Sequence, residues 1–483
     1  MVEFPTVSVI AILPELVLTL GVVAALFRVV YGGPSTARWL AAIAVATVTL
    51  GLVAVVLQWR HVVEVGEQIS FGTMVVLDRQ AVIGRFVLLV VTGLALAINW
   101  RYVVRLGTRG GEALSLVLLA VIGFMFMGAS NHLVMLFLGL EVGSISLYIL
   151  AGLGQESEQS DEAALKYFLL GSVASAIFLY GIALLYTGTG ALDYIGVLQF
   201  FGGGLIVFAD GILTLGVALV FVGLLFKIAA APFHAWAPDV YQGSPAGIVG
   251  FMAAAAKVGA LMALLRLIQV PFRTLVSTYQ VPIATVAAVS VVVGTLYAIV
   301  QSDLRRVLAY SGVAHAGFLL MAVAAGPASA VQLIFYVFTY VVMLVAAFGV
   351  VAVVEGPGSA GSPLDHYRGL GRRSPALAAI LAVLMFGLAG MPVTAGFIAK
   401  FGVFTGAWFA GLEWLVIVGL LASVAAFFFY LRVVVLMFFE EGEGTVPSLG
   451  RVAWVGLTVA VVVTLALGVY PSPVLEVLRS AIR

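Results

Sequence analysis

The sequence contains no cysteine and very little charge. Without cysteine, the chain cannot form disulfides, bind an iron–sulfur cluster through thiolates or use a thiolate nucleophile. Only 9% of its 483 residues are charged, against roughly a quarter in ordinary soluble domains. The formal net charge of +1 provides no electrostatic reason to bind nucleic acid or an acidic partner.

Common signatures of soluble enzymes are missing as well. The sequence has no Gly-rich phosphate-binding loop and no dinucleotide-binding fingerprint. Its five histidines are too far apart to follow a metal-ligand spacing; they are His61, His132, His234, His315 and His366. We therefore expect no cofactor or metal in this chain and place any redox chemistry in other proteins.

Apolar residues make up 63% of the chain. They form long runs without alternation, which predicts helices that cross a membrane, each needing roughly 20 apolar residues. We expect an all-α polytopic membrane protein of about fourteen spans: 7–30, 38–58, 82–100, 113–130, 133–153, 163–187, 211–231, 245–268, 281–301, 305–325, 329–353, 377–408, 413–438 and 451–471. The first span lacks the pattern of a cleavable signal peptide and is expected to remain as an anchor. The stretch 195–208, with three consecutive glycines, is expected to be an interfacial loop.

The arginines predict the orientation, because basic residues stay on the cytoplasmic side. A non-cytoplasmic N-terminus places twelve of them inside: Arg28, Arg38, Arg101, Arg105, Arg109, Arg305, Arg306, Arg368, Arg372, Arg373, Arg432 and Arg451. Seven then fall outside: Arg60, Arg79, Arg85, Arg266, Arg273, Arg479 and Arg483. The bias predicts that both termini lie on the non-cytoplasmic side.

Two of the spans are unsuited to a continuous helix. Span 7 runs into Pro232, while span 12 is overlong and contains Gly390 and Pro392. Because these spans are five apart, spans 4–8 and 9–13 are predicted to form two inverted five-helix repeats, each broken in its fourth helix. Two unrelated proline kinks are the alternative. The predicted units are an N-terminal three-helix segment (1–110), the two repeats (111–270 and 271–440) and a C-terminal helix with its tail (441–483).

The four lysines are distributed differently from the nineteen arginines. Every loop cation is an arginine, whereas Lys227, Lys257 and Lys400 lie in apolar spans and Lys166 opens span 6. A guanidinium keeps its proton in a protein, but a buried ammonium group can release it. A charge at the centre of a membrane helix costs about 2.5–3.5 kcal/mol. The pattern therefore predicts a proton relay.

Glu141, near the centre of span 5, is the carboxylate expected to act with these lysines. We expect it to stabilise protonated Lys227, so that an increase in their separation releases a proton toward Lys257 and then Lys400. His234 and His315 are possible further members, because imidazole titrates near neutral pH.

Each of these residues also has a structural explanation. Lys166 could extend to the lipid headgroups, and Glu141 could form a static ion pair with Lys227. The two histidines and the seven tryptophans could be packing residues or, for tryptophan, interface anchors. Glu15, in the first span, is expected near the outer membrane surface.

Four segments resemble the antiporter-like subunits of respiratory complex I. They are LKYFLLGSVASAIFLYG (165–181), KIAAAPFHAWAPDVYQGSP (227–245), RRVLAYSGVAHAG (305–317) and GMPVTAGFIAK (390–400). Within this family, the DVYQGSP turn is similar to that of the subunit N type of the NADH–quinone oxidoreductase. The resemblance extends over about 130–405.

The resemblance implies a proton-translocating subunit without a redox centre. Its relay would use Glu141, Lys227, Lys257 and Lys400, with Lys166 as the lysine of span 6. NADH, FMN, iron–sulfur clusters and quinone would be bound by partner subunits. The partners would be an antiporter-like neighbour, small helical subunits and lipids, in a prokaryotic inner or plasma membrane.

Three other classes remain open. Related subunits occur in cation/proton antiporters, membrane-bound hydrogenases and complexes that oxidise ferredoxin or a reduced deazaflavin. A purely structural scaffold would gain nothing from costly interior lysines. A solute porter is expected to offer a roomy polar pocket, whereas this sequence offers a thin line of charges.

Overall fold

Helices make up nearly all of the computed structural model, which describes residues 7–33, 36–107, 109–153, 158–203, 211–355, 361–443 and 449–482. The α-helices are α1 (Leu13–Val30), α2 (Thr36–Val65), α3 (Arg79–Arg105), α4 (Arg109–Gly128), α5 (Leu133–Gly152), α6 (Glu158–Thr189), α7 (Tyr194–Gly202), α8 (Gly211–Lys227), α9 (Trp236–Gly243), α10 (Ala246–Gln269), α11 (Val276–Ile299), α12 (Leu304–Ala324), α13 (Ala330–Glu355), α14 (Leu370–Arg373), α15 (Pro375–Ala389), α16 (Ala395–Phe409), α17 (Glu413–Phe439), α18 (Arg451–Val469) and α19 (Ser472–Ala481). The strands β1 (Gln68–Ser70) and β2 (Val75–Leu77) pair antiparallel.

Twelve helices in the described ranges are long and apolar enough to cross a membrane, judged by length and composition. Three shorter apolar helices, α8, α15 and α16, occupy the two remaining predicted spans. α8 ends at Lys227, where span 7 was predicted to bend, and span 12 is divided into α15 and α16. The helical membrane fold and its two discontinuous spans are therefore confirmed, whereas the number of crossings and the inverted repeats stay predictions.

Two local elements differ from the prediction. Residues Tyr194–Gly202 form α7 instead of a loop, because Asp193 Oδ1 accepts a hydrogen bond from the Gly196 amide at 2.8 Å and so caps the helix. The remaining part of that stretch, 204–208, and also Arg483 lie outside the described residues. The β1–β2 hairpin was not expected, because strands of three residues are too short to leave an alternating pattern.

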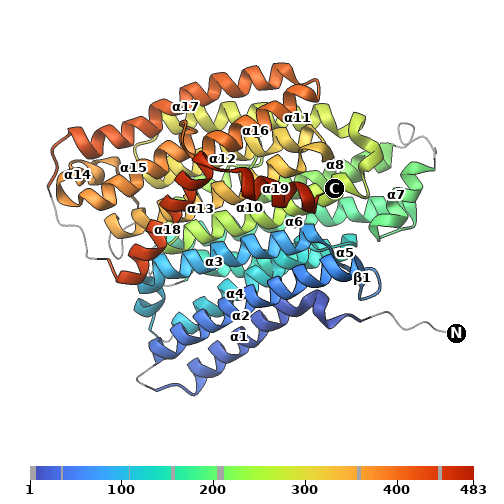
Figure 1. Cartoon of the computed structure of the whole chain (residues 1–483), viewed down its shortest axis with the longest axis horizontal. Coiled ribbons are helices and arrows are strands. Elements are labelled where there is room, and N and C mark those ends of the chain that lie inside the picture. The colour runs from blue at the N-terminus through green and yellow to red at the C-terminus, as the bar shows by residue number, and fades with distance from the viewer. Residues whose placement is uncertain are drawn as a thin grey trace.

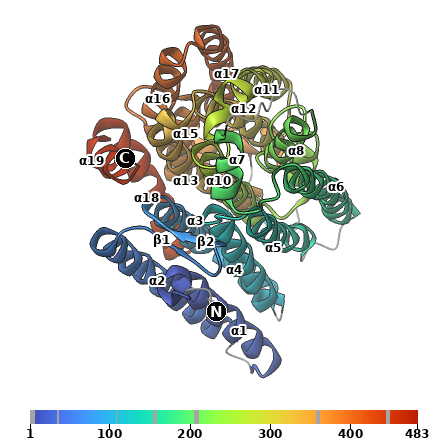
Figure 2. The ribbon, with the colours of Figure 1, turned by 90° about the vertical axis from the view of Figure 1, so that its right-hand side faces the viewer.

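The long helices lie side by side in one bundle. α1 and α2 form one edge and α17 forms the opposite edge (Figure 1). In the end-on view of Figure 2, α10 lies inside the bundle, while α6 and α17 lie at its outside. The membrane-spanning parts of α10 and α12 are completely covered by other helices. Lys257, on α10, is therefore held at the centre of the protein.

Buried ion pairs attach the N-terminal helices to the rest of the bundle. Arg85 Nε of α3 donates to Glu15 Oε1 of α1 at 2.7 Å. Arg266 of α10 binds both oxygens of Asp78, the residue that caps α3, at 2.7 and 2.8 Å. Glu15 is thus enclosed by protein and 2% exposed, while its expected position near the outer membrane surface stays a prediction.

Three arginines in the orientation argument are not loop cations. Arg85, Arg266 and Arg305 are 1%, 4% and 1% exposed, and each is paired with a carboxylate inside the protein. A charge neutralised by a buried partner does not report which side of the membrane a loop occupies. These three arginines therefore carry little information about the orientation, which stays a prediction.

Close approach through glycine occurs between α4 and α5 and again between α11 and α12. α4 and α5 meet at Gly123, where an added Cβ would lie 2.7 Å from Gly139 O. α11 and α12 meet at Gly294, where a Cβ would lie 2.7 Å from Tyr310 O. Small residues allow such close backbone approach between membrane helices. These two pairs are the first two helices of each predicted repeat, so the same packing recurs at equivalent places.

The substitution Gly294→Ala is expected to lower the stability of the protein by about 1–3 kcal/mol, because its methyl group would overlap the α12 backbone. Thermal unfolding of the purified full chain in detergent measures this effect. Gly202→Ala is the matched control, since a Cβ at Gly202 meets no atom within 4 Å. Equal unfolding temperatures for the two variants would contradict the tight packing of α11 against α12.

Candidate functional site

The first helix break follows α8. Ala229 adopts a left-handed conformation, with φ of 58°, and the Ala230 amide donates to Leu225 O at 3.0 Å. This is the geometry of a Schellman turn, and Pro232 follows it because proline cannot continue a helix. Lys227 is consequently the last residue of α8, where the negative end of the helix dipole favours a cation.

Lys227 is 3% exposed, and its ammonium group faces tyrosine rings. Its Nζ lies 5.0 Å from the ring centroid of Tyr148 on α5 and 5.6 Å from that of Tyr167 on α6. It also donates to Tyr148 Oη at 3.3 Å. Tyr167 stacks in turn on Trp236 of α9, with ring centroids 4.5 Å apart. We call Tyr148, Tyr167 and Trp236 the aromatic pocket; the negative faces of the two tyrosine rings stabilise the cation.

Glu141 lies two helical turns before Tyr148 on α5. Its Oε1 accepts a hydrogen bond from Ser175 Oγ of α6. Its carboxylate acts electrostatically on the Lys227 ammonium group, yet no ion pair between them is found among the described residues. The static ion pair that was the structural alternative for Glu141 is therefore not formed, and the interaction acts at longer range.

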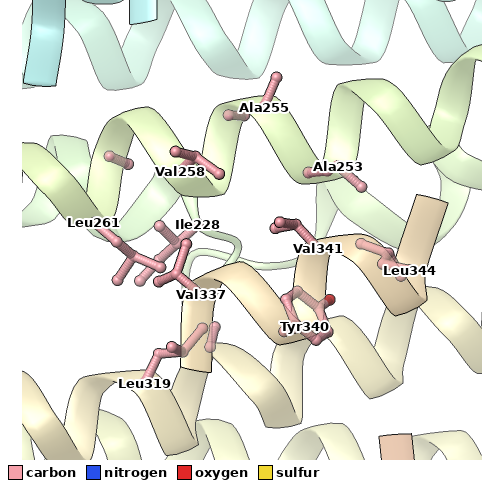
Figure 3. Close-up of a cluster of buried hydrophobic side chains, with 14 of the residues drawn as sticks. Ile228, Ala253, Ala255, Val258, Leu261, Leu319, Val337, Tyr340, Val341 and Leu344 are labelled. Atoms are coloured by element: carbon pink, nitrogen blue, oxygen red, sulfur yellow. The ribbon is translucent and has the colours of Figure 1, made fainter. Parts of the chain in front are cut away.

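Lys257 is 2% exposed and lies between α12 and α13. Its Nζ is 5.9 Å from the ring centroid of Tyr340 on α13. A Cβ at Gly312 of α12 would lie 3.4 Å from Nζ, so the glycine leaves room for the ammonium group. The packing of α10 against α13 is otherwise apolar (Figure 3). The figure labels Ala253, Val258 and Leu261 of α10 and Val337, Tyr340, Val341 and Leu344 of α13.

His315 of α12 connects the Lys257 side of the site with the Lys400 side. Its ring stacks on Tyr340, with centroids 4.5 Å apart. Its Nδ1 lies 2.9 Å from Tyr336 Oη, and its Nε2 lies 3.2 Å from Tyr430 Oη of α17. The ammonium groups on α10 and α16 both act electrostatically on this ring. His315 is therefore packed and hydrogen-bonded at once, and it is placed between two lysines.

The second break separates α15 from α16. Gly390 is left-handed, with φ of 84°, and the Met391 amide donates to Phe386 O at 2.9 Å. The turn is again of the Schellman type, with Pro392 directly after it. Lys400 of α16 reaches back to this turn, and its Nζ donates to Ala389 O at 2.7 Å.

Lys400 has two further neighbours. Its Nζ donates to Ser423 Oγ of α17 at 3.0 Å and lies 4.8 Å from the ring centroid of Phe318 on α12. The carbonyl at the end of α15 and the serine hydroxyl replace water around the ammonium group, as is required where backbone breaks inside a membrane. The broken helix thus builds part of the lysine site.

Lys166 and His234 lie apart from the buried lysines. The Lys166 side chain is 41% exposed and forms ion pairs with Glu162 at 2.7 Å and Asp239 at 3.0 Å. His234 lies in the first break, with its ring 6.3 Å from that of Tyr310. The structure therefore groups Glu141 with Lys227, and Lys257 with His315 and Lys400, but assigns Lys166 to an ion-pair network at the surface.

Buried arginines and buried lysines differ in their partners. Within the described ranges, each of the three buried arginines pairs with a carboxylate; the pairs are Arg85–Glu15, Arg266–Asp78 and Arg305–Glu355. Lys227, Lys257 and Lys400 are at most 4% exposed, and none of them forms an ion pair with another described residue. The same ranges hold no group of three His, Asp or Glu able to bind a metal ion.

The tyrosines of the site were not predicted from the sequence. These are Tyr148, Tyr167, Tyr336, Tyr340 and Tyr430. Tyr148 carried a usable signal, because it follows Glu141 by seven residues and so shares its helix face. The position of Tyr340 opposite Lys257 depends on the packing of α13 against α10, which no sequence spacing reveals.

The substitution Gly390→Ala is expected to reduce ion translocation, because its Cβ would lie 2.8 Å from Lys400 Cδ and displace the lysine. The left-handed backbone adds a strain of about 1–2 kcal/mol. Gly411→Ala is the matched control: its φ of 77° imposes the same strain, but nothing lies within 4 Å. Translocation is measured in membrane vesicles and stability by thermal unfolding. Equal translocation in both variants would contradict the expected role of the Lys400 position.

A protein-family model described as NADH:quinone oxidoreductase/Mrp antiporter, TM, matches residues 130–426. NADH-quinone oxidoreductase subunit N of Trichlorobacter lovleyi is 38% identical, and the alignment covers 99% of this chain and 98% of the relative. A chain of respiratory complex I from Thermus thermophilus is 33% identical, with a TM-score of 0.79, covering 96% of this chain and 98% of that one.

A chain of the Mrp complex from Dietzia sp. has a TM-score of 0.84 over 98% of this chain and 97% of its own, at 21% identity. This likeness shows a shared fold. The family model and the full-length similarity to subunit N agree with this fold. The chain therefore belongs to the NADH:quinone oxidoreductase/Mrp antiporter family of membrane subunits.

Proposed function

We propose that this chain is a proton-translocating membrane subunit of a respiratory NADH–quinone oxidoreductase. The relatives named subunit N support this assignment, since one of them aligns over 99% of the chain. Glu141, Lys227, Lys257 and Lys400 would carry the protons, with His315 between the last two. His234 and Lys166 are possible members at the margin of the relay.

One observation carries the proposal: three ammonium groups are buried without a carboxylate partner in the described part of the chain, while every buried arginine there has one. Fixed charges that only hold helices together are best neutralised by a partner. An ammonium group that must give up and regain a proton is better held by neutral groups, such as tyrosine and backbone carbonyl. This is the arrangement around Lys227, Lys257 and Lys400.

The proposed first step is electrostatic. The Glu141 carboxylate stabilises protonated Lys227 at long range, and the aromatic pocket adds to this. A displacement of Glu141, driven from outside this chain, would weaken the attraction. Lys227 would then release its proton into the bundle, because an isolated charge is unstable at low dielectric.

The later steps would use the neighbours of His315. Proton transfer needs donor and acceptor within about 2.6–3.2 Å, or one bridging water. Tyr340 lies beside Lys257 and stacks on His315, whose Nε2 is 3.2 Å from Tyr430 Oη. This last distance allows direct transfer, whereas the longer separations would need bridging water. Ile228, next to Lys227, lies in one apolar cluster with Val258, next to Lys257 (Figure 3), so we propose that water enters this cluster transiently. The two breaks supply the backbone groups that can hold such water.

The proposal extends to the organisation of the chain. Two inverted repeats, 111–270 and 271–440, would each contribute one broken helix and one lysine beside its break. The recurrence of glycine-mediated packing in α4–α5 and α11–α12 supports these repeats. The first 110 residues and those after 440 would flank them.

Redox chemistry would take place in partner subunits. NADH, FMN, iron–sulfur clusters and quinone would be bound there, since this chain has no cysteine to ligate a cluster. An antiporter-like neighbour, small helical subunits and lipids would surround it in a prokaryotic inner or plasma membrane. We place both termini on the non-cytoplasmic side.

A second candidate function is exchange of a cation for protons, as in a multi-subunit antiporter. The fold shared with a chain of the Mrp complex supports cation/proton exchange as an alternative. The higher identity to subunit N relatives favours the first proposal. Proton uptake that requires Na⁺ rather than NADH would support exchange.

The substitution Lys257→Met in the intact complex is expected to reduce NADH-driven proton uptake by inside-out membrane vesicles on the order of tenfold or more, as for removal of a group that transfers protons. Lys257→Arg is expected to reduce proton uptake as well, because arginine keeps the charge but cannot release the proton. Uptake is followed with a pH-sensitive dye. Recovery in Lys257→Arg would indicate a static charge and contradict a relay.

Leu261→Met is the matched control. Leu261 lies one turn further along α10, is 1% exposed and tolerates a swap of similar volume. This variant is expected to retain proton uptake. Immunodetection of all variants in the membrane shows whether the subunit is assembled. Normal uptake by assembled Lys257→Met would refute the proposed function.

A further inference from the structure

Helix α9 follows the first break and is held by charges from two other helices. Asp239 Oδ2 accepts a hydrogen bond from Lys166 Nζ of α6 at 3.0 Å. Asp239 Oδ1 accepts one from Arg306 Nη1 of α12 at 2.8 Å. We call Lys166, Asp239 and Arg306 the α9 triad. It connects a helix of the first predicted repeat with one of the second.

Trp236 lies one helical turn before Asp239 and faces the lysine site. Its ring stacks on Tyr167, and its indole N–H donates to Phe226 O, near the end of α8, at 3.2 Å. Tyr167 lies 5.6 Å from Lys227 Nζ. A single turn of α9 therefore joins the triad to the aromatic pocket.

Helix α6 also connects the α9 triad with the aromatic pocket. Lys166 and Tyr167 are neighbours in sequence, but the Lys166 side chain is 41% exposed whereas Tyr167 is 1% exposed. Lys166 points to Asp239, and Tyr167 faces Lys227 and Trp236. A change in the distance between α6 and α9 at the triad must therefore alter the stacking of Tyr167 on Trp236.

We propose that Asp239 is a positioning residue for Lys227. By binding Lys166 and Arg306 together, it fixes α9 against α6 and α12, and through Trp236 and Tyr167 it sets the aromatic surroundings of the Lys227 ammonium group. That this positioning matters for proton movement rests on the proposed function. The positioning itself does not.

The Asp239 carboxylate binds two cations, whereas a carboxylate in an ordinary surface ion pair binds one. Single exposed pairs contribute little to stability, but this carboxylate is shared by two cations, which would repel each other without it. Partial burial raises the pKa of the Asp239 carboxyl, yet hydrogen bonds from Arg306 and Lys166 outweigh this and hold the pKa below its usual value. Lys166 and Asp239 line a pocket of about 220 Å³.

Another contact keeps α9 in place when Asp239 is changed. Arg305 Nη1 donates to Gln242 O at 2.6 Å and to Ser244 O at 2.9 Å, at the end of α9. Its guanidinium is also paired with Glu355 of α13. We therefore expect Asp239→Asn to fold, with α9 attached at its end but displaced at the triad.

The test uses the full chain, labelled with ¹⁵N-lysine and reconstituted in lipid vesicles. The chain has four lysines, so solid-state NMR gives four Nζ signals, assigned by single Lys→Met variants. In Asp239→Asn we expect the Lys227 signal to shift and the Lys400 signal to stay. Trp236→Phe, which keeps the triad, is expected to shift Lys227 and not Lys166.

Glu162→Gln is the matched control. Glu162 is the other carboxylate on Lys166, at 2.7 Å, but it belongs to α6 itself and is 63% exposed. This variant is expected to shift the Lys166 signal only. An unmoved Lys227 signal in Asp239→Asn, or an equal Lys227 shift in Glu162→Gln, would overturn the positioning role.

Proton uptake by the intact complex completes the experiment. Asp239→Asn is expected to lower uptake on the order of tenfold, as small misplacements of a transfer group can, while Glu162→Gln retains it. If the Lys227 signal shifts but Lys257→Met still pumps, the proposed function fails and the positioning stands. If Lys257→Met stops pumping but the Lys227 signal does not move, the positioning alone fails.

Discussion

A buried ammonium group without a counter-ion is the constraint on which the rest of this structure depends. Charge placed in a medium of low dielectric is costly unless nearby dipoles replace the lost water. The protein provides these dipoles by interrupting helices and by surrounding the lysines with hydroxyl groups and aromatic rings. Lys400 binds a carbonyl that the second break exposes, and Lys227 lies in the aromatic pocket beside the first break.

Arginine and lysine have separate tasks within the bundle. The buried arginines bind carboxylates and fasten segments that are distant in sequence, as Arg266 does with Asp78. Their permanent charge suits this task, because a neutralised pair does not change with proton movement. The buried lysines have neutral partners instead. We propose that the same fold combines rigid electrostatic fastening with buried lysines whose protonation changes.

The two breaks have the same backbone turn, but the lysine lies on a different side of it in each. Both begin with a left-handed residue, an i to i−5 hydrogen bond and a following proline. Lys227 precedes its break, whereas Lys400 follows its own and reaches back. The consequence is a different neighbourhood: the first lysine adjoins α9 and its charged triad, and the second adjoins Ser423 and Phe318. We propose that surface charge can thus act on Lys227 through α9.

The sequence by itself determined the membrane class, the helices, the positions of the two breaks and the placement of Lys227, Lys257 and Lys400 in apolar spans. Apolar runs, prolines and rare interior charges are local features whose cost does not depend on the partners of a residue. Only the tertiary structure decided that Arg85 is paired, that Lys166 lies at the surface, and that Tyr340 and His315 stand between two lysines. Such facts arise from contacts between helices far apart in the chain, where helical periodicity identifies a face but not the helix that covers it.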